Sequence, residues 1–181
     1  MTLKELLLNT EGKHLTYSQY LSTEEWISKR EEIIKRDDFQ CTQCKREDTI
    51  DNFDPVTKKT EHLWLVDNGV VYLGGDTASV NNIFVSADKH YHLEVHHTRY
   101  ILNRLPWDYI SEDLITLCNH CHTEFHQHNK VPVYSEDELI ELEYEPCPKC
   151  NGTGYIPEYR HVQGGICFQC LGNKYKKRLI L

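Results

Sequence analysis

The chain has neither a surplus of positive charge nor a long hydrophobic run. Among its 181 residues, 20 Lys and Arg stand against 28 Asp and Glu, which gives a formal net charge of -8. Proteins that bind nucleic acid without selectivity normally present a basic face, so this balance argues against that class and requires any phosphate contact to be local. No segment approaches the roughly 18 to 20 apolar residues of a membrane span, and we expect no membrane partner.

Signs of export are absent as well. The opening MTLKELLLNTEGKH shows neither a basic leader region nor a small-residue cleavage site, so we expect a cytoplasmic protein. The eight cysteines all fall in four CxxC pairs, which in a reducing compartment favour metal thiolates over disulfides. The length suits one main domain with a small satellite.

The apolar patterns predict a mixed α+β fold. Ser22 and Glu25 form a capping box ahead of a helix over about 23–36. Two apolar runs around Asp67-Asn68-Gly69 predict a β-hairpin inside a β-rich insert at about 51–90. The other predicted elements are a helix over 3–8, strands over 81–86, 91–95 and 113–118, and a helix over 119–128.

Four CxxC pairs can hold two tetrahedral zinc ions, because each pair supplies two thiolate ligands. The last two pairs are separated by 16 residues, a spacing typical of a zinc ribbon. The first two pairs then join across the insert, although pairing between the sets stays open. We expect both zinc ions to be structural, since four thiolates leave no open coordination position. The expected sets are Cys147, Cys150, Cys167 and Cys170, and Cys41, Cys44, Cys118 and Cys121.

Histidines gather in the middle of the chain, where eight of the eleven lie between residues 90 and 128. His122 and His126 stand four residues apart, on one face of the expected helix. His96 and His97 are neighbours on an expected strand, where successive side chains point to opposite faces. One of this pair can therefore join the helix histidines around a divalent ion, while the other keeps a free imidazole that accepts a proton from water. The alternative is that these histidines are solvated or complete the zinc sites.

Three segments together, WISKREEIIKRDDFQCTQC, LEVHH and DLITLCNHCHTEFH, resemble the HNH endonuclease family over about residues 26–128. The resemblance implies a ββα-metal (His-Me finger) core stapled by two CxxC pairs. It implies metal-dependent hydrolysis of phosphodiester bonds, with DNA as the partner. His97 resembles the general base, and His96, His122 and His126 resemble the ligands of one catalytic ion, which could be Mg²⁺, Mn²⁺, Ni²⁺ or Zn²⁺.

Two further positions belong to this resemblance. Glu94 resembles the glutamate that braces an arginine in the family. Asp113 stands where the family has the Asn of its motif, nine residues before the first helix histidine. An aspartate accepts hydrogen bonds but has no amide N-H to donate. We expect Asp113 still to orient the loop that follows the paired histidines.

The C-terminal segment resembles the CxxCxGxG zinc motif of DnaJ-type chaperones. CPKCNGTG fits the motif completely, whereas CFQCLGNK keeps only its first glycine. These two copies are half the usual four, so the resemblance implies zinc binding but not chaperone activity. The C-terminal module is also a candidate surface for binding a protein partner. The chain is expected to divide into an HNH domain over 1–135, with a helical N-terminus over 1–40, and a zinc ribbon over 145–181.

Several basic residues are candidate DNA contacts. For those at the C-terminal end, a solvated surface run without a ligand is an equally good interpretation. These candidates are Arg99, Arg104, Lys174, Lys176, Lys177 and Arg178, with Tyr175 as a residue able to stack on a base. Trp107 and Tyr109 are expected in the core. One rival interpretation is a catalytically weak or silent, zinc-stapled module that binds nucleic acid or protein. Another is a chaperone-like accessory factor built around the tail.

Overall fold

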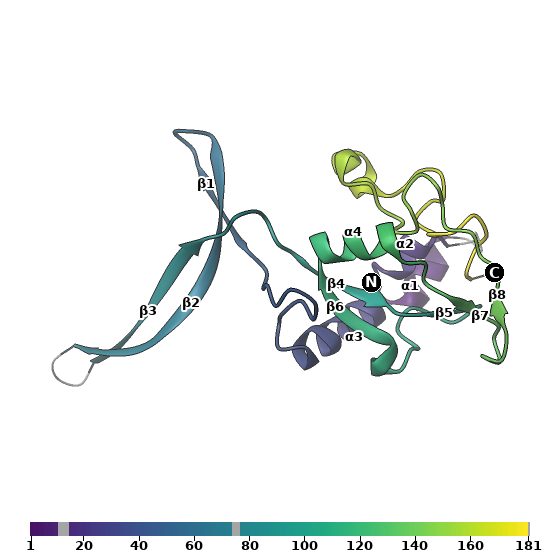
Figure 1. Cartoon of the computed structure of the whole chain (residues 1–181), viewed down its shortest axis with the longest axis horizontal. Coiled ribbons are helices and arrows are strands. Elements are labelled where there is room, and N and C mark those ends of the chain that lie inside the picture. The colour runs from purple at the N-terminus through teal and green to yellow at the C-terminus, as the bar shows by residue number, and fades with distance from the viewer. Residues whose placement is uncertain (11–14, 74–76, 181) are drawn as a thin grey trace.

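A computed structural model of the chain describes residues 1–10, 15–73 and 77–180. The fold is mixed α+β, as the apolar patterns predict. Figure 1 shows a compact body, a long three-stranded arm that projects from it, and a loop-rich C-terminal segment that lies above helix α4. Among the described residues, none of the helices combines the length and the apolar character needed to cross a membrane.

The helices are short and the strands fall into three small sheets. The α-helices are α1 (Leu3–Asn9), α2 (Tyr17–Tyr20), α3 (Glu24–Arg36) and α4 (Asn119–His128), with 3-10 turns at Ser111–Asp113, Pro157–Tyr159 and Gln163–Gly165. The strands are β1 (Ile50–Asp54), β2 (Lys59–Leu73), β3 (Thr77–Ser86), β4 (Leu93–His97), β5 (Tyr100–Ile101), β6 (Leu114–Cys118), β7 (Val133–Tyr134) and β8 (Glu141–Leu142).

Helix α3 begins one residue later than its predicted cap. Thr23, not Ser22, is the N-cap residue, and its hydroxyl accepts a hydrogen bond from the N-H of Trp26. The predicted capping box is wrong because its two members bond elsewhere. The Ser22 hydroxyl donates to the carbonyl of Gln19, and the Glu25 carboxylate accepts from the N-H of Leu3. The Glu25 carboxylate therefore links α3 to α1 by a hydrogen bond and does not take part in the predicted capping box of α3.

The arm consists of β1, β2 and β3, paired antiparallel in that order. The hairpin predicted around Asp67-Asn68-Gly69 is wrong, because β2 runs through these residues as one strand. Its register shifts between Asp67, opposite Asn82, and Val70, opposite Val80, so three steps on β2 match two on β3. One extra residue is absorbed in this way as a β-bulge, and the chain reverses only after β2 ends.

The main core lies between α3 and the β4–β6 hairpin. The two strands pair antiparallel from Leu93 opposite Cys118 to His97 opposite Leu114, and α4 follows β6 without a loop. Ile33 of α3 is completely buried against this hairpin. Helix α3 and helix α4 thus cover a common scaffold, which fixes where the β4 side chains lie relative to those of α4.

A second buried cluster draws together three distant parts of the chain. Tyr17 of α2, Tyr100 of β5 and Tyr175 near the C-terminus pack against one another. The acidic stretch over 135–146 turns back as β8, which pairs with β7. Tyr144 is buried in the same cluster, so the cysteine-rich C-terminal segment is joined to the body by packed structure.

Candidate metal centres and the cleft beside them

The first cysteine set joins the end of α3 to the start of α4. Its four sulfurs lie within 4.8 Å of one another, and the sulfurs of Cys44 and Cys118 are 3.7 Å apart. Sulfurs bound to a tetrahedral zinc ion at about 2.3 Å stand roughly 3.8 Å apart, whereas a disulfide needs about 2.05 Å. The N-H of Cys121 points at the Cys118 sulfur, which also caps α4. This set is suited to a structural zinc ion.

The second set lies wholly in the C-terminal segment. Sulfur pairs of this set are 3.9 Å apart for Cys147 and Cys167 and 3.7 Å apart for Cys150 and Cys170. The two sets of the sequence prediction are therefore the two sets in space, and each satisfies the zinc geometry. Hydrogen bonding by the Cys170 thiol, together with the N-H of Gly154, lowers the pKa of Cys150 to about 5, which favours the ligating thiolate.

Gly154 shows why the second glycine of the CxxCxGxG pattern is needed. Its φ is +77°, and a Cβ placed there would stand 2.8 Å from the carbonyl oxygen of Gly172. The backbone of Gly154 therefore lies very close to the backbone of Gly172. A side chain at position 154 would push the two CxxC turns apart.

Three histidines form a separate centre between β4 and α4. His96 comes from the strand, and His122 and His126 come from successive turns of the helix. One ring nitrogen from each lies within 4.8 Å of the others, and the Nε2 atoms of His122 and His126 are 3.2 Å apart. Two nitrogens on a tetrahedral ion at 2.0 to 2.1 Å stand about 3.4 Å apart, so the spacing fits a divalent metal. The structure thus brings these three predicted residues together.

The environment of His96 is the strongest indication that this group of histidines binds a metal ion. Its side chain is completely buried, and neither ring nitrogen has a hydrogen-bond partner. A buried polar group without a partner costs free energy, which ligation of an ion would remove. Burial lowers the pKa of His96, and it lowers the pKa of His126 to about 3. Both rings are thus held neutral, the form in which imidazole binds metal.

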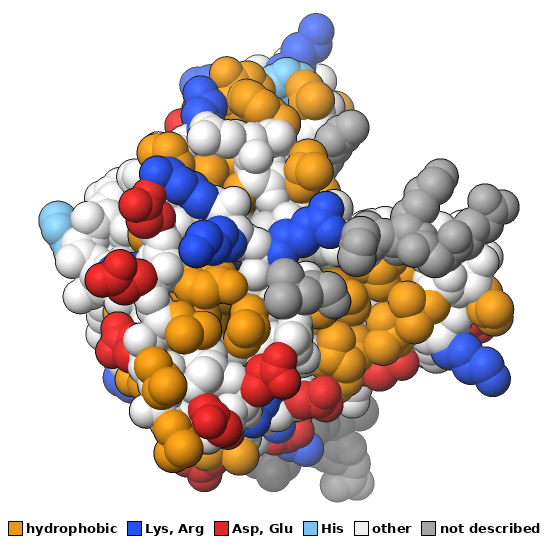
Figure 2. Space-filling model, turned by 90° about the vertical axis from the view of Figure 1, so that its right-hand side faces the viewer, with side chains coloured by type: hydrophobic (Ala, Val, Ile, Leu, Met, Phe, Trp, Pro, Cys, Tyr) orange, Lys and Arg blue, Asp and Glu red, His pale blue; other side chains and the backbone are white. Residues whose placement is uncertain are grey.

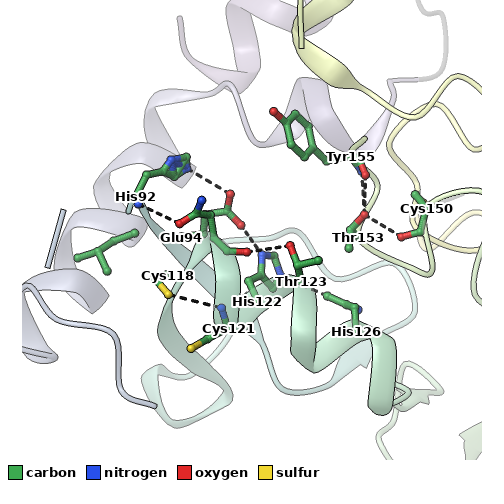
Figure 3. Close-up of polar contacts among 12 residues, drawn as sticks. His92, Glu94, Cys118, Cys121, His122, Thr123, His126, Cys150, Thr153 and Tyr155 are labelled. Atoms are coloured by element: carbon green, nitrogen blue, oxygen red, sulfur yellow. Dashed lines mark hydrogen bonds and ion pairs between the residues drawn. The ribbon is translucent and has the colours of Figure 1, made fainter. Parts of the chain in front are cut away.

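Glu94 orients the centre from the side (Figure 3). One carboxylate oxygen contacts Nδ1 of His122, and the other lies 3.2 Å from Nε2 of His92. A carboxylate at neutral pH only accepts hydrogen bonds, so Nδ1 of His122 carries the proton and Nε2 is free for a metal. These contacts of Glu94 are to histidines and not to the arginine that the family resemblance implies; Arg30 donates instead to the carbonyl of Leu93, at 2.7 Å.

His97 lies on the opposite face of β4, as the alternation of strand side chains predicts. Its ring stacks on Trp26 and on Tyr100, each with ring centroids 5.2 Å apart, and only 1% of the residue is exposed. Nε2 is 3.0 Å from the carbonyl oxygen of Pro106, so it donates and leaves Nδ1 as the acceptor. Burial lowers the pKa of His97 to about 3. In this arrangement His97 packs as a core histidine.

Asp113 binds the residues that directly follow His97. Its carbonyl accepts the N-H of Thr98 at 2.8 Å, and its carboxylate is 2.8 Å from Nε of Arg99. Glu138 contacts both Arg99, at 3.0 Å, and Arg104, at 2.7 Å. The two arginines predicted as phosphate contacts are therefore engaged in ion pairs.

The chain end places its candidate residues in different environments. Lys174 is 6% exposed, and its ammonium lies 2.5 Å from the Tyr100 hydroxyl; burial lowers its pKa to about 8. Tyr175 is buried and donates to the carbonyl of Val131, so its ring is not open to a base. Lys176 pairs with Glu145, while Lys177 and Arg178 are exposed. Lys174 is a buried packing residue and cannot reach a phosphate at the surface.

A cleft of about 1040 Å³ runs beside the trihistidine centre. One wall is α4 with the first part of β4, and the other is the C-terminal zinc segment. Sequence reasoning missed the second wall, because no pattern links Lys149, Tyr155 or Arg160 to the histidines. His92 had a detectable signal, since it shares a strand face with Glu94 and His96. The residues that line the cleft include His92, Glu94, His126, Lys149, Tyr155 and Arg160.

Comparison of the chain with protein-family models, curated proteins and solved structures finds no match. The functional assignment consequently depends on the residues and their geometry.

Proposed function

We propose that the protein is a metal-dependent phosphodiester hydrolase that cleaves DNA, with a ββα core of HNH type formed by β4, β6 and α4. The observation that carries the proposal is the convergence of His96, His122 and His126 beside an open cleft. Three neutral imidazoles hold a divalent ion and leave positions for other ligands, unlike the two closed cysteine sites. The two cysteine sets are proposed to hold structural Zn²⁺.

The chain's own groups divide the work. When bound, a divalent ion supplies Lewis-acid stabilisation of charge on a phosphate and lowers the pKa of water. His96, His122 and His126 would hold that ion, and Glu94 would keep the His122 ring in the ligating tautomer. The cleft beside His126 would bring the scissile phosphate to the centre.

His97 remains the proposed general base, acting through Nδ1, because Nε2 is committed to the Pro106 carbonyl. A base must come within hydrogen-bond reach of the attacking water, and such contacts often tighten only when substrate binds. The aromatic rings of Trp26 and Tyr100 therefore have to admit water to Nδ1 for this role. Burial of His97 is also the observation that favours the second candidate, a silent binding module with an intact metal centre.

A supercoiled-plasmid relaxation assay tests the proposal. Wild type, His126→Ala and His97→Gln are purified with zinc in the cysteine sites, and each is assayed with Mg²⁺, Mn²⁺, Ni²⁺ or Zn²⁺ added after chelation of the weaker site. Gln at position 97 retains a donor for Pro106 and avoids a large cavity, and circular dichroism checks each fold. We expect relaxation by wild type and loss with His126→Ala.

The result for His97→Gln assigns the base. A loss of 100-fold or more in rate is expected for a residue that transfers the proton, since general base catalysis contributes roughly 10² to 10⁴. An unchanged rate assigns His97 to packing alone. Absence of cleavage of both supercoiled plasmid and single-stranded circular DNA, by folded wild type with every ion, would refute the hydrolase proposal and leave the binding module.

A further inference from the structure

We infer that the C-terminal zinc segment carries a binding surface for a single strand of nucleic acid, formed by Tyr155, Lys149 and Arg160 on the wall of the cleft that faces the trihistidine centre. The inference deepens the proposed function, on which it depends for the chemistry done at the histidines. It assigns to the zinc ribbon a substrate-binding role beyond the structural stability that its zinc ion provides.

The position of Tyr155 is the first support. Figure 3 shows its ring on the zinc-ribbon side of the cleft, across from Glu94. The ring lies directly on the backbone of Gly165, where a Cβ would stand 2.3 Å from the ring edge. Tyr155 also forms a β-bridge with Ile166, and its N-H and carbonyl both bond to the Thr153 hydroxyl. The edge of the ring is packed against backbone and the residue lines the cleft, so the ring is a rigid platform of the kind on which a base can stack.

Charge is the second support. Lys149 and Arg160 line the same wall and are exposed. The Lys149 ammonium lies 5.7 Å from the ring centre of Phe168, and neither cation has an ion-pair partner among the residues that the structure describes. Cations on the zinc-ribbon part of this acidic chain are visible in Figure 2, where Lys and Arg gather mainly in the upper half and Asp and Glu in the lower half. Unpaired cations next to an aromatic platform match a phosphate backbone with stacked bases.

The opposite wall limits what can enter. Besides the metal-binding histidines, it presents His90, His92, His120 and His128 as hydrogen-bond donors and acceptors. The three carboxylates that line the cleft are Glu94, which is occupied by His92 and His122, and Glu124 and Glu158, both exposed. With walls on two sides, the cleft suits one extended strand whose bases are free to stack. A duplex keeps its bases paired inside and offers Tyr155 no face.

Fluorescence anisotropy tests the inference without any cleavage. The full chain, zinc-loaded at the cysteine sites and without added divalent ion, is titrated into a labelled 20-nucleotide single strand and into the matching duplex. We expect tighter binding of the single strand. Tyr155→Leu should weaken that binding by about 5- to 150-fold, the equivalent of 1 to 3 kcal/mol for one stacked base, and Tyr155→Phe should restore it because the ring is kept.

The cations are tested by salt dependence. Lys149→Gln with Arg160→Gln should reduce the slope of log affinity against log salt by about 1.4, since each phosphate contact on a single strand contributes about 0.7. Lys35→Gln is the control, because Lys35 is exposed on α3 and does not line the cleft, and it should change affinity by less than twofold.

The outcomes separate this inference from the hydrolase proposal. Equal affinity of wild type and folded Tyr155→Leu, or preference for duplex, overturns the strand-binding surface even if plasmid is cleaved. Binding that depends on Tyr155 in a protein that cleaves nothing supports the surface while refuting the hydrolase. Equal loss with Lys35→Gln and with the double variant would show general attraction and likewise overturn the inference.

Discussion

The neighbouring residues His96 and His97 have different environments because successive side chains of β4 point to opposite faces of the strand. His96 faces α4 and has two ring nitrogens without partners, whereas His97 faces Trp26 and bonds to a carbonyl. The doublet thus gives one side chain to the trihistidine cluster and one to the core. Residue chemistry alone does not distinguish the two; the alternation of β4 does.

Glu94 should control metal affinity at the trihistidine centre. Glu94→Gln removes the charge that fixes the proton on Nδ1 of His122. We expect affinity for Co²⁺ or Ni²⁺ to fall about 10- to 100-fold, as for other carboxylates bonded to a ligating histidine. Titration followed by visible absorption measures the change. Glu124→Gln, an exposed carboxylate of the same cleft, should leave affinity unaltered. A Glu94→Gln titration that overlays wild type would remove this role.

Asp113 should stabilise the segment that follows His97. Asp113→Asn weakens the contact with Arg99, which is partly exposed, so we expect a loss of about 1 kcal/mol in the free energy of unfolding. Urea denaturation with zinc present measures it. Asp108→Asn is the control, since Asp108 is exposed nearby. Equal stability of both variants would show that the ion pair contributes nothing.

At the scale of elements, the sequence predicts those whose local pattern agrees with their packing. Helices α3 and α4 and strands β4 and β6 lie where periodicity and the CxxC turns place them. The prediction at Asp67-Asn68-Gly69 is wrong because β2 pairs with β3 on both sides of these residues, and that pairing outweighs a local turn preference. Spacing on the helix and alternation on the strand predict that one histidine of the doublet joins His122 and His126, and the family resemblance is what points to His96. The zinc-ribbon wall could not be predicted, since its place beside α4 depends on contacts between residues such as Tyr100 and Tyr175, far apart in sequence.

The two cysteine sets should support different elements when zinc is bound. Cys167→Ser disrupts the set that lies within the C-terminal segment, and zinc content should fall from two ions per chain to one. Limited proteolysis should then cut within 145–181 while the body resists. Cys44→Ser disrupts the set that joins α3 to α4, and cleavage should spread through the body. Identical digestion patterns for the two variants would contradict this division.

On the scale of the whole molecule, the arm is the part least tied to the body. Its strands carry exposed apolar side chains, including Phe84 at 52% exposure. At its base, the N-H of Thr49 donates to the carbonyl of Tyr91 at 2.9 Å, and the N-H of Tyr91 donates to the Thr49 hydroxyl at 3.0 Å. The chain therefore leaves the body and returns to it at one closed point (Figure 1).

This closure predicts that the arm can be removed without unfolding the body. Replacement of residues 50–90 by Gly-Asn-Gly should leave two zinc ions per chain and cooperative thermal unfolding, because Thr49 and Tyr91 are already held together and a short loop is cheap to close. The main loss should be the contact of Trp64 with Tyr91 and Arg46, whose separations are 5.6 Å between ring centroids and 4.8 Å from guanidinium to ring. Trp64→Ala in the full chain measures that contact separately. An arm-deleted protein much less stable than Trp64→Ala would show that the arm supports the body as a whole; similar stability would make it an appendage whose function lies outside the metal centres.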